Sequence, residues 1–229
     1  MKVIFLDIDG VIQPCGKQDR FEHIEDIDVV YKELNEKFGI DYYKYNEFDV
    51  AAVYYDWNTV ALRELRRIVD TTGAKIVISS DWKLFGGLQR MIDFMRIYDM
   101  AEYLIDVTPD AGKDKRVRQL QEERSSCETR SAEILVYLER HPEVTNYIAI
   151  DDMDLRRGLG IHAIITPNRL IRIVADRCIE ILMSQPDNIP EGRNDWRPKY
   201  DYVQRQNARG EWILRQVSDL DEELREGRY

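Results

Sequence analysis

Short apolar runs alternate along the chain with longer stretches in which apolar residues recur every three or four positions. The short runs predict five β-strands, at Val3–Leu6, Lys75–Ser79, Tyr103–Val107, Tyr147–Ile150 and Ala163–Thr166. Between the first two, residues 57–73 predict a helix, because Leu62, Leu65 and Ile68 share one helical face and Gly73 can end it. Strands that alternate with helices are typical of βαβ units. We therefore predict an α/β fold with a mostly parallel sheet.

Three further amphipathic stretches, residues 88–100, 131–141 and 170–183, predict helices by the same spacing. Residues 13–56 break the alternation, because they are too long for a plain connection. They contain a predicted short helix at 29–39 and a tyrosine-rich segment after it. We interpret residues 13–56 as a small insertion, or cap, over the site.

The composition changes near residue 186. Pro, Asn, Asp, Gly and Arg are frequent from Pro186 to Pro198, and residues 211–227 then predict a possible helix. We therefore predict one domain over residues 1–185 and a C-terminal extension over 186–229. The extension is expected to pack through Trp196 or Trp212.

Length and charge narrow the function classes. The 229 residues, 44% of them apolar, suit one domain of ordinary size, and the formal net charge is −10. Such a molecule repels polyanions and membrane surfaces, so any contact with nucleic acid has to be local. No run approaches the roughly 18 apolar residues of a membrane span, and the first apolar run is too short and too acidic for a signal peptide. We predict a soluble, cytoplasmic protein, of a subunit number that the sequence does not indicate.

The cysteines and histidines give little support for a metal site in which they are the ligands. Cys15, Cys127 and Cys178 are odd in number, widely spaced and without a CxxC pair, which argues against a disulfide framework and a zinc site. The three histidines are equally scattered. We expect the cysteines to serve in packing.

Acidic side chains follow two of the predicted strands. Asp7 and Asp9 come after the first strand, two positions apart and so on one face, and Gly10 permits a tight turn. The fourth strand is followed by Asp151 and Asp152. Because parallel sheets gather their chemistry at the carboxyl ends of the strands, we expect these carboxylates to converge.

Converging carboxylates need a counter-charge. Each pair about 4 Å apart costs on the order of 4 kcal/mol at an effective dielectric near 20. A hard divalent cation removes this conflict, and oxygen ligands favour Mg²⁺. The tetrapeptide Asp-x-Asp-Gly alone also marks turns and calcium loops, but Val11 stands where a calcium loop needs its third ligand. A magnesium site that attracts an anion is therefore expected.

The segments "FLDIDGV", "IVISSDW", "RSAEI" and "YIAIDDMD" have the order and spacing of the haloacid dehalogenase (HAD) superfamily. The resemblance covers about residues 3–183 and implies a Rossmann-like three-layer sandwich. More narrowly, "ISSDW", "DVTPD", "RSAEILVYLERHPEV" and "IDDMD" resemble the HAD domain of Swiss Army knife RNA-repair proteins, relatives of the phosphatase domain of polynucleotide kinase-phosphatase. The resemblance implies phosphate-ester hydrolysis.

The resemblance also implies roles for the acidic residues. Asp7 matches the nucleophile that forms an aspartyl-phosphate, and Asp9 matches the general acid and base. The metal ligands implied are Asp7, the backbone carbonyl of Asp9, and Asp151 and Asp152. Which of Asp151 and Asp152 touches the ion directly stays open.

Polar and basic residues complete the implied site. Ser79 matches the hydroxyl that binds the phosphoryl group, with Ser80 as the other register; either serine could instead cap the next helix. Arg130 matches the basic residue that neutralises the phosphoryl oxygens. If Arg130 is only a solvated helix residue, Lys113 or Lys115 would take its place.

Other side chains leave two interpretations open. Trp82 and Lys83 resemble a Trp-Arg pair of the subfamily and are candidate substrate contacts. The basic run at 113–118 can bind a phosphate backbone or form a solvated face. Asp154 and Arg156 fit local hydrogen bonding better than metal binding. Five tyrosines of the insertion can stack on a base, although packing is favoured: Tyr42, Tyr43, Tyr45, Tyr54 and Tyr55.

The expected function is a Mg²⁺-dependent phosphatase acting on a phosphorylated small molecule or a nucleic-acid end. The resemblance favours nucleotides or polynucleotide termini, and the acidic surface favours small metabolites. A third hypothesis is a HAD-fold protein that binds its ligand without turnover.

Overall fold

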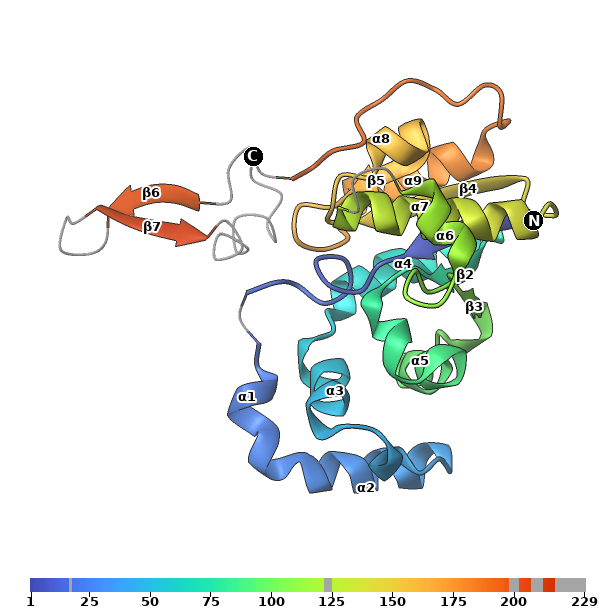
Figure 1. Ribbon diagram of the computed structural model, residues 1–229. Coiled ribbons are helices and arrows are strands. Elements are labelled where there is room, and N and C mark those ends of the chain that lie inside the picture. The colour runs from blue at the N-terminus through green and yellow to red at the C-terminus, as the bar shows by residue number, and fades with distance from the viewer. Residues whose placement is uncertain (17, 122–124, 198–201, 207–211, 217–229) are drawn as a thin grey trace.

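A five-stranded parallel sheet forms the centre of the protein, here described from a computed structural model (Figure 1). The structure describes residues 1–16, 18–121, 125–197, 202–206 and 212–216. The strand order is β3-β2-β1-β4-β5, and every pairing in the sheet is parallel. The strands are β1 (Lys2–Leu6), β2 (Lys75–Ile78), β3 (Leu104–Val107), β4 (Asn146–Asp151) and β5 (Ala163–Ile165). The predicted α/β fold and all five predicted strands are confirmed, with ends that differ by one residue at most.

The sheet is covered on both faces, as a three-layer sandwich requires. Successive side chains of β1 point to opposite faces: Ile4 packs in one core cluster, while Val3 and Phe5 pack in another. The Ile4 face is covered by α4 (Thr59–Thr72), α5 (Gly87–Arg96) and α9 (Arg172–Met183). The opposite face is covered by α7 (Ser126–Arg140) and α8 (Arg156–Leu159), and α6 (Lys115–Leu120) packs on α7.

The long helix α7 begins five residues before its predicted start. Ser125 is its N-cap, and the Ser125 hydroxyl accepts a hydrogen bond from the backbone N–H of Glu128. This serine followed three residues later by glutamate is a capping-box sequence. The predicted start at Ser131 was therefore wrong, because the apolar pattern begins a full turn after the helix itself.

The predicted insertion is helical and shares the main core. It contains α1 (Arg20–His23), α2 (Ile27–Phe38) and α3 (Glu47–Ala51), which lie together on one side of the sheet (Figure 1). Short helical turns link them at Ile24–Asp26 and Tyr42–Lys44, and a π-helix follows at Ala52–Asp56. Val50 and Val53 lie in the same cluster as Ile4 of β1.

The tyrosines of the insertion serve mainly to pack it. Tyr42 is fully buried and its hydroxyl donates to the carbonyl of Asp93, while the Tyr45 hydroxyl donates to the Asp93 carboxylate. Tyr43 stacks on Tyr31 with ring centroids 4.5 Å apart. The packing interpretation is therefore the one that the contacts support.

The C-terminal part differs from its prediction. Residues Trp212–Gln216 form the strand β7, paired antiparallel with β6 (Tyr202–Gln206), so the helix predicted over 211–227 is wrong at these positions. The remainder of that predicted helix lies outside the described residues. The extension packs through Trp196, which is buried in the main core, and its N–H donates to the carbonyl of Ile165.

Three short 3₁₀ helices complete the described elements: η4 (Asp81–Phe85), η5 (Ala101–Tyr103) and η6 (Gly160–His162). In the part of the chain that the structure describes, no helix combines the length and the apolar character needed to cross a membrane.

Candidate active site

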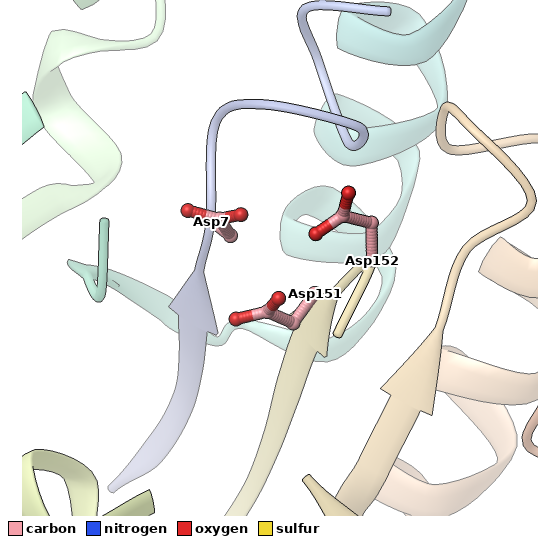
Figure 2. Close-up of side chains that lie close together, drawn as sticks. All are labelled: Asp7, Asp151 and Asp152. Carbon is pink, nitrogen blue, oxygen red and sulfur yellow. The ribbon is translucent and has the colours of Figure 1, made fainter. Parts of the chain in front are cut away.

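Three carboxylates meet at the carboxyl ends of β1 and β4 (Figure 2). Leu6 of β1 lies opposite Ile150 of β4, so the next residues, Asp7 and Asp151, fall side by side. One oxygen each from Asp7, Asp151 and Asp152 lie within 4.8 Å of one another. Parallel pairing of neighbouring strands thus brings together Asp7, Asp151 and Asp152, three of the four carboxylates that the sequence leads us to expect here.

The turn after β1 brings Asp152 close to the chain. Gly10 has φ +70°, and a Cβ placed on it would lie 2.6 Å from the Cβ of Asp152, which real Cβ atoms do not tolerate. The Thr166 hydroxyl donates to the carbonyl of Gly10 at 2.7 Å and fixes the turn from β5. Glycine is therefore required here both by the backbone angle and by the space that Asp152 occupies.

Arg130 joins the two strand ends from helix α7. Its Nη1 donates to Asp7 Oδ1 at 2.9 Å and to Asp151 Oδ2 at 3.1 Å, and its Nη2 lies 3.6 Å from Asp81. Burial opposes the charge, but the two buried carboxylates outweigh it and raise the pKa of Arg130 above its ordinary value. Arg130 is therefore a buried, permanently charged guanidinium at the cluster.

The contacts of Lys113 do not support its alternative assignment as the basic residue of the site. Lys113 pairs with Asp110 at 3.3 Å on the surface, and its side chain is mostly exposed. Arg130, by contrast, contacts both Asp7 and Asp151 directly.

Two carboxylates of the cluster, Asp151 and Asp152, lie in an environment that disfavours their charges. Burial, followed by the negative charge of Asp7, raises the pKa of Asp151 well above its ordinary value, and Arg130 only partly offsets this. The same two causes raise the pKa of Asp152. Two buried carboxylates and the half-buried carboxylate of Asp152, with one cation, have an unbalanced negative charge. The oxygen donors and this excess charge fit a hard divalent cation such as Mg²⁺.

Asp9 lies outside this group of three carboxylates, and two side chains hold its carboxylate. Gln13 Nε2 donates to Asp9 Oδ1 at 2.7 Å, and Trp82 Nε1 donates to Oδ2 at 3.0 Å. Burial raises the pKa of Asp9, although the bond from Trp82 opposes the shift. A fixed carboxyl with a raised pKa suits proton transfer. The carboxylate of Asp9 is not a member of the cluster, so only its backbone carbonyl, as the resemblance implies, would serve a metal.

The two serines after β2 lie at the same sheet edge. The Ser79 N–H donates to the carbonyl of Leu6 at 2.8 Å, which places Ser79 beside the start of the Asp7 loop. Ser79 and Ser80 are both buried, and the Ser79 hydroxyl has no hydrogen-bond partner among the described residues. Ser80 precedes η4 but its side chain makes no cap bond. The unpartnered hydroxyl of Ser79 supports the phosphoryl-binding register over the capping alternative.

A comparison with protein families identifies the domain. Residues 3–171 match the family described as the HAD domain in Swiss Army Knife RNA repair proteins. The chain belongs to this family. The matched region begins in β1 and ends just before α9, so it contains all the carboxylates described above. No curated protein and no solved structure gives a significant match.

In this HAD domain, Lys83 has a different partner from the one predicted. Its Nζ lies 2.6 Å from Oε2 of Glu133, and both side chains are buried. Oε1 of Glu133 accepts a hydrogen bond from the N–H of Ala111 at 2.9 Å. The ammonium of Lys83 thus joins the η4 loop to helix α7, and its predicted substrate contact is not supported by this pairing.

Gln13 and Glu133 of the HAD domain were not predicted from the sequence. Gln13 lies four residues after Asp9 in an otherwise apolar buried segment. This polar residue in an apolar segment is the sequence feature that could have indicated its contact with Asp9. Glu133 follows Arg130 by three residues and therefore shares its side of α7. Its pairing with a residue 50 positions away has no local signal.

The remaining charged candidates form surface pairs. Arg116 pairs with Glu139 at 2.7 Å, and Arg118 donates to the carbonyl of Gly112 at 2.8 Å, so two of the basic residues in the 113–118 run are engaged locally. Asp154 pairs with Arg156 at 2.6 Å, and this guanidinium lowers the pKa of Asp154. These contacts favour the solvated and local interpretations.

Proposed function

We propose that this HAD domain is a phosphomonoester hydrolase that uses Mg²⁺ and forms an aspartyl-phosphate on Asp7. The observation that carries the proposal is the convergence of Asp7, Asp151 and Asp152 with the buried guanidinium of Arg130. Three carboxylates and one cation can together accept a metal ion and, through it, a phosphate group. Membership of the HAD family supports the same class of hydrolysis.

The first step transfers the phosphoryl group to the protein. A carboxylate oxygen of Asp7 attacks phosphorus, the bond to the leaving oxygen breaks, and the carboxyl group of Asp9 donates its proton to that oxygen. In the second step Asp9 accepts a proton from water, whose oxygen attacks phosphorus and releases phosphate and Asp7. The raised pKa of Asp9 and its fixation by Gln13 and Trp82 support this role.

Neighbouring groups balance the charge of the phosphoryl oxygens. Arg130 would hold Asp7 for attack and stabilise the charge that spreads over these oxygens, and the hydroxyl of Ser79 would donate to one of them. Asp7, Asp151, Asp152 and the carbonyl of Asp9 would hold Mg²⁺, which supplies charge neutralisation when bound. The unpartnered Ser79 hydroxyl supports its assignment.

The substrate class is proposed from the family. Its description names RNA repair proteins, which favours a nucleotide or a polynucleotide terminal phosphate as substrate. The net charge of −10 favours a small metabolite phosphate instead. End-labelled 3′- and 5′-phosphorylated oligonucleotides, compared with nucleotides and sugar phosphates, separate the two.

The reaction is tested by phosphate release from an aryl phosphate, with Mg²⁺ and after its removal by chelation. We expect activity only with Mg²⁺ and none in Asp7→Asn, while the exposed control variant Asp187→Asn keeps wild-type activity. Undiminished turnover in Asp7→Asn contradicts the covalent route. Stabilisation by phosphorylated ligands without any release of phosphate would favour a binding protein instead.

A further inference from the structure

Three phenylalanine side chains of this acidic protein are exposed to solvent. Phe85 is 82% exposed, Phe21 57% and Phe48 44%, whereas Phe5 and Phe94 are fully buried. Exposed apolar residues that gather near a site mark a surface for a ligand or a partner. We name Phe21, Phe48 and Phe85 the aromatic rim, and contacts of neighbouring residues link the elements that carry them.

Phe85 lies one turn of η4 beyond a residue of the site. In a 3₁₀ helix, side chains three positions apart eclipse one another, at a rise of about 6 Å per turn. Phe85 is therefore on the same face as Trp82, whose indole donates to Asp9. Leu84, which is also exposed, follows Asp81, the neighbour of Arg130, in the same way. Leu84 and Phe85 thus form an exposed apolar surface, the η4 ledge, next to the site residues Asp81 and Trp82.

Arg90 connects this ledge to the insertion. Its Nη2 pairs with Asp49 at 2.5 Å, and Asp49 directly follows Phe48 on α3. Its side chain also packs on Gly86, the residue after Phe85: a Cβ on Gly86 would lie 2.7 Å from the Cδ of Arg90. The insertion and the η4 ledge are therefore held together beside the site.

Phe21 completes the rim from α1. Its ring centroid lies 6.3 Å from that of Phe48, and the guanidinium of Arg20 lies 5.1 Å above the Phe21 ring. Arg20 is itself fixed by an ion pair with Asp56 at 3.2 Å. The three rings thus belong to elements that are joined by defined contacts.

We infer that the aromatic rim binds the base of a nucleotide whose phosphate lies at Asp7, with Phe85 as its main stacking partner. The inference rests on the proposed function, because it places the phosphate at the carboxylate cluster. A base has flat apolar faces that stack on such rings, whereas a sugar or an alkyl chain has none. Arg20 and Arg90 already pair with acidic residues, so stacking and not attraction to a phosphate backbone supplies the affinity.

The test compares leaving groups in a variant that leaves the core unchanged. Base stacking on one aromatic ring corresponds to about a 5- to 150-fold effect on binding. We expect Phe85→Ala to raise KM for nucleoside monophosphates about 10-fold and to leave KM for glycerol phosphate unchanged. Phe85→Trp should keep the wild-type KM, and Ile173→Ala, an exposed apolar residue of α9, is the matched control.

A mononucleotide and a short oligonucleotide with one terminal phosphate form two arms of the test. A raised KM for both substrates in Phe85→Ala supports one base at Phe85. Equal effects of Phe85→Ala on nucleotides and glycerol phosphate would overturn the inference. An unchanged nucleotide KM would also overturn it and would assign the rim to a protein partner.

A second experiment distinguishes failure of the proposed phosphatase function from failure of the stacking inference. If wild-type protein releases no phosphate from any substrate, the phosphatase proposal fails, and the rim is tested by equilibrium binding to Asp7→Asn. Nucleoside monophosphate should then bind about 10-fold more weakly after Phe85→Ala, while inorganic phosphate binds equally to both proteins. Equal binding of the nucleotide would overturn the inference in this arm as well.

Discussion

Two groups of charged side chains in this HAD domain, each with one member on helix α7, differ in their charge balance. Lys83 and Glu133 form a pair of one cation and one anion, and the carboxylate of Glu133 has a further hydrogen bond from the backbone. At the carboxylate cluster, three acidic residues share the single guanidinium of Arg130. The pair is complete within the protein, whereas the cluster has excess negative charge. The pair is self-sufficient in charge, whereas the excess charge of the cluster is what the proposed metal ion would neutralise.

The largest effect is expected from breaking the balanced pair. Lys83→Met leaves the buried carboxylate of Glu133 without its cation, and we expect the free energy of unfolding to fall by about 3–5 kcal/mol. Combining Lys83→Met with Glu133→Gln removes both charges and should restore most of that loss. Urea unfolding of the wild type, the single variant and the double variant measures this. A double variant as unstable as Lys83→Met would contradict a mainly electrostatic role for the pair.

Removing the cation of the cluster should act on catalysis. Arg130→Ala is expected to lower kcat about 100- to 1,000-fold, because a charged donor to the phosphoryl oxygens is lost. Arg130→Lys should retain part of the activity, since it keeps the charge but not the two-carboxylate geometry. Steady-state kinetics with an aryl phosphate checks both values. Wild-type kcat in Arg130→Ala would remove this residue from the mechanism.

Only the unbalanced cluster should respond to metal. Mg²⁺ at about 100 times its dissociation constant should stabilise the wild-type protein by about 2.7 kcal/mol. Asp151→Asn should lose most of this stabilisation, whereas Asp187→Asn, which alters an exposed carboxylate, should keep it. Thermal unfolding with Mg²⁺ and with a chelator measures the difference. A metal response that survives in Asp151→Asn would place the ion elsewhere.

The smallest effect concerns pH in the absence of metal. The pKa of Asp151 is raised in the folded protein, so above about pH 4 the unfolded chain binds fewer protons than the folded one. The free energy of unfolding should therefore fall as pH rises, by at most about 1.4 kcal/mol per pH unit for this group, until folded Asp151 ionises. Unfolding in chelator at several pH values should show a steeper fall in the wild type than in Asp151→Asn. Parallel curves would exclude this contribution of Asp151.

Much of the fold and part of the site follow from local patterns in the sequence. The five apolar runs predict strands, and the rule that parallel strands end at one edge predicts the meeting of Asp7 with Asp151. The resemblance to the HAD superfamily adds Arg130, which no periodicity indicates. Its contacts with both carboxylates agree with that assignment.

Features that depend on distant partners could not be predicted. Lys83 is a candidate substrate contact because Trp82 and Lys83 resemble a Trp-Arg pair of the subfamily, but its partner Glu133 lies 50 positions away on another element. The run at Trp212–Gln216 forms a strand because it pairs with Tyr202–Gln206, whereas its pattern alone favoured a helix. In both cases the tertiary partner determines the outcome.

Position 10 offers a simple criterion for reading related sequences. The space that a methyl group would need at Gly10 is taken by the side chain of Asp152. A relative that carries alanine or any larger residue there, while keeping both acidic motifs, should therefore have rearranged its second motif. We expect such a relative to lack the arrangement of three carboxylates that Asp7, Asp151 and Asp152 form here.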